Sequence, residues 1–249
     1  MIRPLALGLL GMTLCFAQPR AAKALRPGAF PVVVELFTSE GCSSCPAADA
    51  ILARLDREGV IIMGEHVDYW DNLGWKDRFS SPLFSSRQQD YGTAMKNGTI
   101  YTPQAVINGE KEVLGSDARA IDAAIRDASR RIPAEVQFKL SGEQNVSIQV
   151  GKLPPNSHKA DVLLAVTETA LETNVASGEN GGHKLRHAAV VRSLSRLAEL
   201  DPKKPGEYVA EARLNLNPEW NRANLKLVLL VQDRENRHIL GAATLKPKP

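Results

Sequence analysis

The stretch Glu35-Leu-Phe-Thr-Ser-Glu-Gly-Cys-Ser-Ser-Cys-Pro46 joins an apolar run to two cysteines that are separated by two residues. The run from Val32 to Phe37 is β-branched and apolar, which is typical of a strand buried on both faces. After the cysteines, Ala47 to Glu58 carries apolar side chains at helical spacing, and Gly59 follows as a stop signal. The sequence therefore predicts that the cysteine pair lies between a buried strand and the N-terminus of a helix.

The chain continues to alternate between strand and helix signals up to residue 130. Further strands are predicted at 60–67, 104–107 and 111–114, with Asn108-Gly109 as a hairpin turn. Helices are predicted from Pro82 to about Lys96 and from Ser116 or Asp117 onward. The order β-α-β-α-β-β-α predicts parallel pairing of the first strands and an antiparallel strand at the edge.

From residue 134 the pattern changes to short alternating runs separated by turn residues. Seven strands are predicted there, at 136–140, 146–150, 161–167, 188–194, 208–214, 225–231 and 239–244. Runs of this length and spacing are typical of an antiparallel sandwich. We therefore expect an α/β domain over residues 30–131 and an all-β, sandwich-like domain over residues 134–249.

The N-terminus, residues 1–24, has the features of a signal peptide. Arg3 precedes an uncharged apolar run, Leu5 to Phe16, which is too short to span a bilayer as a mature helix. Cleavage is expected after Ala17 or after Ala24, and an uncleaved membrane anchor is the alternative. We expect an exported protein, periplasmic or secreted, that does not contact the membrane once the signal peptide is removed.

Removal of the signal peptide also removes Cys15, so that the exported chain keeps Cys42 and Cys45. In an oxidising compartment such a pair is expected to exist as a disulfide for at least part of its life.

Composition narrows the functional class. The chain has 249 residues, of which 43% are hydrophobic and 24% charged, so it can bury substantial cores. Its net charge of +3 is too small to indicate nucleic-acid binding. No nucleophile elbow, phosphate-binding loop or catalytic pair of carboxylates stands out, so no hydrolase or nucleotide-binding class is predicted.

The placement of the cysteines favours redox chemistry. At a helix N-terminus, free N–H groups and the helix dipole stabilise a thiolate at Cys42, and its pKa is expected to fall below about 8.5. Cys45, one turn later, is close enough to resolve a mixed disulfide. Two alternatives remain open: a purely structural disulfide, which would close a short ring and gain little entropy, and binding of a thiol-seeking metal ion such as Cu(I).

A second motif, Tyr101-Thr-Pro-Gln-Ala-Val-Ile-Asn-Gly109, places Pro103 immediately before a predicted strand. Together with the cysteine pair, this pattern resembles the thioredoxin and glutaredoxin superfamily. The resemblance implies a thioredoxin-like α/β domain with Cys42 as the attacking thiol and Cys45 as the resolving thiol. It also implies that Pro103 is cis and faces the cysteines, while the Thr102 backbone pairs with a bound peptide or thiol.

The segment Gly115-Ser116-Asp117 adds to the glutaredoxin-like pattern, and the resemblance implies that it falls where glutaredoxins hold the end of glutathione. More narrowly, Val34–Pro46, His66–Asp71 and Tyr101–Gly109 are similar to an uncharacterised family of exported bacterial thioredoxin-like proteins. That family implies a fold and a signal peptide but no settled activity.

Two positions depart from the superfamily pattern. Gly41 stands before the first cysteine where thioredoxins have tryptophan, and Ser43-Ser44 replaces the usual dipeptides between the cysteines. Glu35 lies roughly where thioredoxins keep a buried acid, so we expect it either to accept a proton from Cys45 or to form a salt bridge.

The cluster His66-Val-Asp68-Tyr-Trp70-Asp71 follows the second predicted strand, at the end of a parallel sheet where ligands bind. His66, Asp68 and Trp70 either shape a substrate or metal site or belong to a hydrogen-bonded loop with packed aromatic side chains. His183 and His187 have ligand-like spacing only on a helix, and a strand is predicted there, so no metal site is expected.

These observations predict a thiol–disulfide oxidoreductase that uses Cys42 and Cys45 without a cofactor or metal. Its partner would be a protein or small molecule that bears a thiol or disulfide. The alternative is a non-enzymatic binding module or Cu(I) carrier that uses the same two cysteines. The direction of electron flow and the oligomeric state stay open.

Overall fold

The structure is a computed structural model of the chain and describes residues 30–56, 59–96, 98–130, 134–142, 144–204 and 207–248. The predicted signal peptide, residues 1–24, lies outside the described residues. Within the described ranges, every helix is too short or too polar to cross a membrane.

The first part of the chain has the predicted order of elements. Strand β1 pairs in parallel with β2, and β3 pairs antiparallel with both β1 and β4. Helix α3 begins after Asp117, whose carboxylate accepts the N–H groups of Arg119 and Ala120. The bounds are β1 Val32–Thr38, α1 Cys45–Leu55, β2 Val60–His66, α2 Pro82–Ala94, β3 Gln104–Ile107, β4 Lys111–Leu114 and α3 Ala118–Ala128.

The second part contains all seven predicted strands and two that were not predicted, β8 and β9. These two are short and polar, so their sequences lack an apolar alternation. The bounds are β5 Val136–Leu140, β6 Asn145–Val150, β7 Ala160–Glu168, β8 Leu171–Asn174, β9 Lys184–His187, β10 Val190–Leu200, β11 Tyr208–Arg213, β12 Leu225–Asp233 and β13 Ile239–Leu245.

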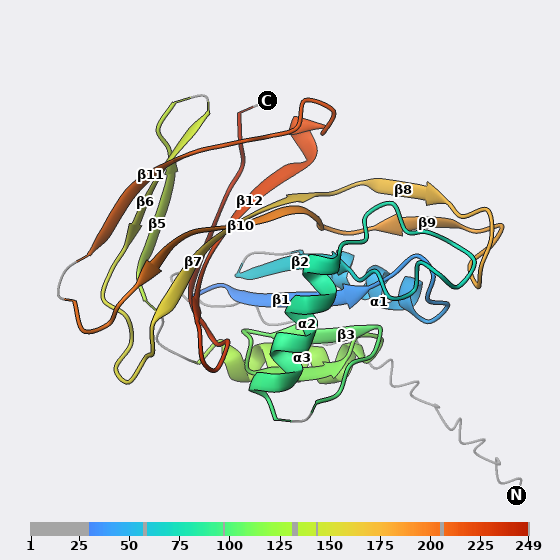
Figure 1. The fold of residues 1–249 in the computed structure, drawn as a ribbon, viewed down its shortest axis with the longest axis horizontal. Coiled ribbons are helices and arrows are strands. Elements are labelled where there is room, and N and C mark those ends of the chain that lie inside the picture. The colour runs from blue at the N-terminus through green and yellow to red at the C-terminus, as the bar shows by residue number, and fades with distance from the viewer. Residues whose placement is uncertain are drawn as a thin grey trace, which may run out of the picture.

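The predicted fold class, a thioredoxin-like α/β domain followed by an all-β sandwich-like domain, is wrong. The described chain is mostly β, and one eight-stranded mixed sheet in the order β13-β12-β7-β10-β2-β1-β3-β4 takes four strands from each side of the expected boundary (Figure 1). The physical reason is that β2 does not end the sheet, because its free edge pairs in parallel with β10. The predicted domain limits, at residues 131 and 134, separate two groups of strands that belong to this one sheet. The limits themselves stay a prediction.

The contact between β2 and β10 depends on Gly64. Its N–H donates to the carbonyl of Ala189 at 2.8 Å, and Val190 is its partner in the parallel register. A Cβ atom on Gly64 would lie 2.9 Å from the carbonyl oxygen of Ala188, closer than such atoms approach in folded proteins. The absence of a side chain at this position therefore lets β10 extend the sheet.

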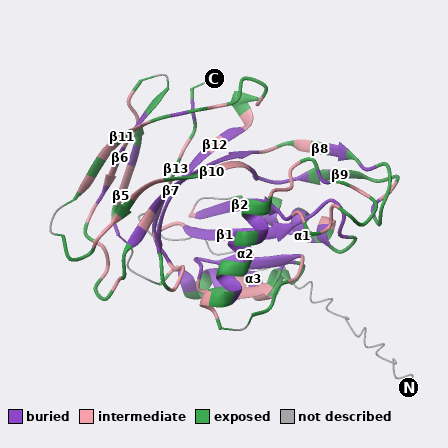
Figure 2. Cartoon of the chain, viewed as in Figure 1, coloured by how far each residue is buried: buried purple, intermediate pink, exposed green. Residues whose placement is uncertain are grey.

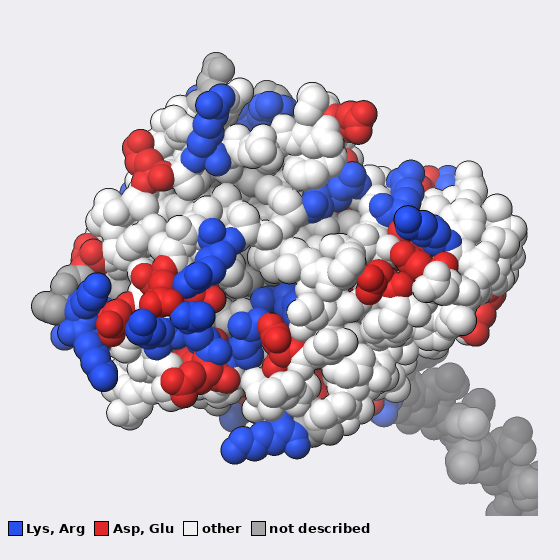
Figure 3. Space-filling view, in the orientation of Figure 1, with Lys and Arg blue, Asp and Glu red and all other residues white. Residues whose placement is uncertain are grey.

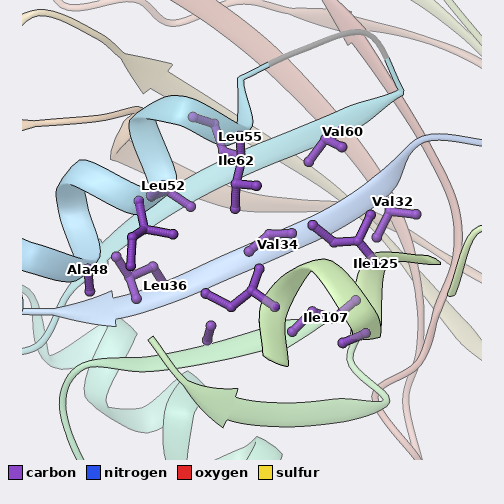
Figure 4. Close-up of a cluster of buried hydrophobic side chains, with 14 of the residues drawn as sticks. Val32, Val34, Leu36, Ala48, Leu52, Leu55, Val60, Ile62, Ile107 and Ile125 are labelled. Carbon is purple, nitrogen blue, oxygen red and sulfur yellow. The ribbon is translucent and has the colours of Figure 1, made fainter. Parts of the chain in front are cut away.

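The two faces of the sheet are covered by different elements. Helices α1 and α3 lie on one face, where Val34, Leu36 and Ile62 point toward the apolar side chains of α1 (Figure 4). Helix α2 lies on the other face, and its Phe84 packs with residues from β1, β2, β7 and β12. Strands β7 and β12 are buried along nearly their whole length (Figure 2).

A sandwich-like arrangement is nevertheless present in the second part of the chain. A three-stranded sheet in the order β11-β6-β5 packs against β7 and β12. The apolar side chains of β6, Val146, Ile148 and Val150, are fully buried in this interface. This part of the prediction is consistent with the structure, although the larger sheet is shared with the first part.

The β8–β9 hairpin reaches from the second part of the chain toward the start of α1, and β9 packs against that helix (Figure 1). On the face of the molecule drawn in Figure 3, basic and acidic side chains are intermingled and do not form a large patch of one sign.

Candidate functional site

Cys42 and Cys45 form a disulfide at the start of α1. The helix begins at Cys45, and Pro46 occupies its first turn, where no backbone N–H is needed. The exposed fractions of Cys42 and Cys45 are only 1% and 0%, whereas Ser43 and Ser44 between them are exposed. The pair therefore lies where the sequence placed it, between β1 and a helix, but both sulfur-bearing residues are covered.

The loop before β3 lies beside this motif. The Thr102–Pro103 peptide bond is cis. Trp70 donates its indole N–H to the hydroxyl of Thr102 at 2.9 Å, and its Cβ would lie 3.1 Å from a Cβ placed on Gly41. Trp70 thus bridges the two loops, and a side chain at position 41 would press against it.

The Gly115-Ser116-Asp117 segment has a structural role at two of its three positions. Gly115 donates its N–H to the carbonyl of Pro103 at 2.9 Å. Asp117 is the N-cap of α3, with its carboxylate held by two helix N–H groups at 3.0 Å. Ser116 is exposed. Gly115 therefore supports the cis-proline loop, and Asp117 caps α3.

Behind the cysteine motif lies a group of ionisable side chains that we call the buried cluster: Glu40, Asp49, His66, Asp77 and His187. Each member is at most 6% exposed. His66 Nδ1 lies 2.6 Å from Asp77 Oδ2, and His187 Nε2 lies 3.1 Å from Glu40 Oε1. The two imidazole rings meet edge to face with centroids 5.1 Å apart.

Neighbouring hydrogen bonds tie the buried cluster to the strands and loops around it. Asp77 also accepts the backbone N–H of Glu40 at 2.9 Å, and Trp75 donates its indole N–H to Glu40 Oε2 at 2.8 Å. The hydroxyl of Thr38, at the end of β1, donates to Asp49 Oδ2 at 3.2 Å.

The members of the buried cluster respond differently to burial. Burial alone would lower the pKa of His66, but the carboxyl groups of Asp77, Asp49 and Glu40 together outweigh it, and the pKa of His66 lies above its usual range. Burial likewise opposes ionisation of Asp77 and Glu40, yet pairing with His66 and His187 respectively holds the pKa of each carboxyl below its usual value. Burial does raise the pKa of Asp49, and the two imidazoles offset this only in part. Asp49 is therefore the carboxyl of the cluster that most readily keeps a proton.

Asp49 is also the ionisable residue closest in helical register to the disulfide. It follows Cys45 by four residues on α1, so the two Cβ atoms lie on one face of the helix, about 5–6 Å apart. Its Oδ1 atom has no hydrogen-bond partner among the described residues. Asp49 was not predicted from the sequence. The available signal was an acidic residue on the otherwise apolar face of a helix that starts at a cysteine.

Glu35, predicted as either a proton acceptor or a salt-bridged acid, forms a salt bridge. Its carboxylate lies 2.6 Å from the guanidinium of Arg87 on α2 and accepts the hydroxyl of Tyr91. Burial and the charge of Glu35 raise the pKa of the adjacent Glu65 well above its usual range. Since side chains alternate along β1, Glu35 faces α2, whereas Thr38 faces α1. The structure therefore separates Glu35 from the helix that carries Cys45.

The predicted group His66, Asp68 and Trp70 is dispersed by the structure. His66 belongs to the buried cluster, Trp70 contacts Thr102, and Asp68 accepts the hydroxyl of Ser85 on α2. Asp68 and Trp70 fit the alternative prediction, a hydrogen-bonded loop with packed aromatic side chains. His66 instead lies on the same side of the sheet as the cysteines.

The loop between β8 and β9 completes the site. Asn180 donates its side-chain N–H groups to the carbonyls of Glu40 and Cys42 at 2.9 and 3.0 Å. Glu179 accepts the backbone N–H of Ser43 at 3.0 Å. Nothing in the local sequence indicated this contact, because it joins positions more than 130 residues apart.

Among the described residues, no three or more His, Cys, Asp and Glu side chains form a group suited to a metal ion. His187 pairs with Glu40, while the ring of His183 contacts the carbonyl of Asn180.

Comparisons with solved structures show that this chain is similar to proteins of known structure. Protein AGR_C_4864 from Agrobacterium tumefaciens has 28% sequence identity and a TM-score of 0.72, over 88% of this chain and 96% of that chain. A domain of the outer membrane lipoprotein Omp28 from Porphyromonas gingivalis has 14% identity and a TM-score of 0.25, over 47% and 87% of the two chains. The latter similarity is too low to carry an argument.

No curated protein matches this chain. A family model does match, over residues 33–232, which include the cysteine pair, the buried cluster and the β8–β9 hairpin. This chain therefore belongs to the DUF1223 family, described as proteins of unknown function.

Proposed function

We propose that the protein is an exported thiol–disulfide oxidoreductase that uses Cys42 and Cys45. The observation that carries this proposal is the Cys42–Cys45 disulfide at the N-terminus of α1, with the buried acid Asp49 one helical turn beyond it. The helix N-terminus favours a thiolate at Cys42, and a carboxyl that holds a proton can serve a thiolate that leaves from Cys45. A purely structural disulfide would need neither the helix N-terminus nor the buried acid.

The reaction conserves electrons and protons in two exchange steps. A thiolate of a client dithiol attacks Cys42 Sγ, so that a client–Cys42 disulfide forms and the Cys42–Cys45 bond breaks. Cys45 leaves with the electron pair and takes a proton from Asp49. The second client thiolate then attacks the client sulfur of the mixed disulfide and releases Cys42 as a thiolate. The client is oxidised by two electrons, and the same steps in reverse reduce a client disulfide.

The test is to trap the mixed disulfide. Cys45→Ala, treated with glutathione disulfide, should accumulate one glutathione per protein, because no thiol remains to resolve the adduct. The matched variant Cys42→Ala should accumulate far less, since it lacks the thiol that the proposal assigns to the attack. Mass spectrometry under non-reducing conditions measures both. The proposal fails if neither variant forms an adduct and Cys42 titrates near the ordinary value of about 8.5.

A further inference from the structure

The β8–β9 hairpin ends in a loop that we call the hairpin tip, residues 175–183. The tip is closed on itself by hydrogen bonds between Val175 and residues 182 and 183. On one side it holds the cysteine loop through Glu179 and Asn180. On the other side the hydroxyl of Ser177 donates to the carbonyl of Gly74, in the loop between β2 and α2.

Asn180 is the part of the tip that lies deepest. It is only 6% exposed, and its single amide group satisfies the carbonyls of both Glu40 and Cys42. A buried side chain with two hydrogen bonds to the segment before α1 fixes the tip against the backbone of Cys42, a residue that is only 1% exposed. A client sulfur cannot reach Cys42 Sγ until something over the motif moves.

Glu179 adds a charge effect. Its carboxylate accepts the N–H of Ser43, directly before the first turn of α1. This is the region in which a Cys42 thiolate would be stabilised by free N–H groups and the helix dipole. A fixed negative charge there disfavours a second negative charge on Cys42, because like charges repel.

We propose that the hairpin tip is a gate on the cysteine pair, in which Asn180 holds the gate closed over Cys42 and Glu179 makes the Cys42 thiol less acidic while it is closed. This inference rests on the proposed function for its biological meaning, but its physical content concerns only access to Cys42 and its acidity. The substrate implied is one that first displaces or rearranges the tip.

The charge effect is tested with Glu179→Gln, which keeps an oxygen acceptor for the Ser43 N–H but removes the charge. The Cys42 pKa, followed by thiolate absorbance in the reduced protein, should fall by about 0.5 relative to the unaltered chain. Glu211→Gln is the control, because it removes the same charge from an exposed position on β11, in the other sheet. The other ionisable groups of the site, Glu40, Asp49, His66, Asp77 and His187, are the same in both variants.

Access is tested with Asn180→Ala, which removes both hydrogen bonds to the cysteine loop. The rate at which dithiothreitol reduces the Cys42–Cys45 disulfide should rise roughly tenfold. In this background Glu179→Gln should lower the Cys42 pKa less than it does alone, because an open tip no longer holds Glu179 on Ser43. If Asn180→Ala does not fold, Ser177→Ala loosens the tip from its other side without touching the cysteine loop and should also accelerate reduction.

The gate is refuted if the folded Asn180→Ala or Ser177→Ala variant is reduced at the unaltered rate. It is also refuted if Glu179→Gln and Glu211→Gln shift the Cys42 pKa equally. These measurements use small reagents and need no client, so they remain decisive even if the glutathione trap fails. Conversely, a successful trap with unaltered rates in the tip variants would keep the proposed function and remove the gate.

Discussion

Two carboxyl groups flank the cysteine pair along the sequence, Glu35 on β1 and Asp49 on α1, and their surroundings assign them different roles. Glu35 is neutralised by Arg87 on the α2 side of the sheet. Asp49 shares a helix face with Cys45 and has a raised pKa because it is buried. At the scale of single residues, the proposed reaction therefore takes Asp49, and not Glu35, as the group that exchanges a proton with Cys45.

Asp49→Asn is expected to slow thiol–disulfide exchange by about a hundredfold, the lower end of what a positioned acid or base contributes. The amide keeps an acceptor for Thr38 but cannot exchange a proton with Cys45. The measurement is the pH profile of glutathione exchange, in which the variant should lose the inflection due to Asp49. Asp127→Asn, on the exposed side of α3, is the control and should leave the profile unchanged. An unchanged pH profile in Asp49→Asn would mean that Asp49 has a packing role and does not exchange a proton with Cys45.

His66 makes the stability of the protein depend on pH. Its pKa is raised in the folded state, so the folded protein binds this proton more tightly than the unfolded chain does. The resulting stabilisation is complete below the unfolded value of about 6.5 and is lost as the pH rises through the folded pKa.

His66→Gln should therefore flatten the decline in the free energy of unfolding above about pH 6.5, measured by urea denaturation at each pH. Asp49 and Glu65, whose pKa values are also raised by burial, contribute declines that begin at lower pH and persist in the variant. A variant that retains the full slope above pH 6.5 would exclude His66 as the source. His158→Gln, at a half-exposed position, is the control.

At the scale of elements, helix α2 is joined to the sheet by a buried network as well as by apolar packing. Arg87 contacts Glu35, Tyr91 and Gln232, which come from β1, α2 and β12. All four side chains are at most 4% exposed. This network connects elements from both parts of the chain across the α2 face of the sheet.

Arg87→Met should lower the free energy of unfolding by about 3–5 kcal/mol, because it leaves Glu35 buried without its cation. Chemical denaturation monitored by circular dichroism measures the loss. The matched variant Arg126→Met, at an exposed position in the last turn of α3, should change stability by less than about 0.5 kcal/mol. Equal effects of the two substitutions would show that the buried pair of Arg87 and Glu35 does not contribute to the free energy of unfolding.

At the scale of the whole molecule, the two parts of the chain form one sheet through the contact of β2 with β10. This pairing also carries the β8–β9 hairpin to α1, because β9 is followed within three residues by the start of β10. The site is consequently built from both parts: the cysteines, Asp49 and His66 from the first, and His187, Glu179 and Asn180 from the second.

Gly64→Ala should destabilise the protein by about 1–3 kcal/mol, because the added methyl group meets the backbone of Ala188. Because the clash lies next to β9, it should also displace His187 and the hairpin, and reduction of the disulfide should accelerate. Gly151→Ala is the control, since its Cβ would make only ordinary contacts of 3.4 Å or more. Stability equal in the two variants would contradict the role given to the glycine.

Much of the local structure could be predicted. Buried runs such as Val32–Phe37, the Asn108-Gly109 turn and the cap at Asp117 each carry their signal within a few residues, and the structure places elements there. The cysteine pair at the start of a helix was predicted for the same reason. Strands β8 and β9 were missed because their stability comes from docking, and their own residues are polar.

Local sequence signals predicted the order of helices and strands, except for β8 and β9, and the position of Cys42 and Cys45, because periodicity, turns and caps act between near neighbours. The tertiary structure was needed to show that the strands share one sheet, that Glu35 pairs with Arg87 of α2, and that Asn180 binds the carbonyl of Cys42. These features depend on pairing between distant segments, as in the contact of Gly64 with Ala189. The residues of a free strand edge or a polar loop do not indicate which distant segment will pair with them.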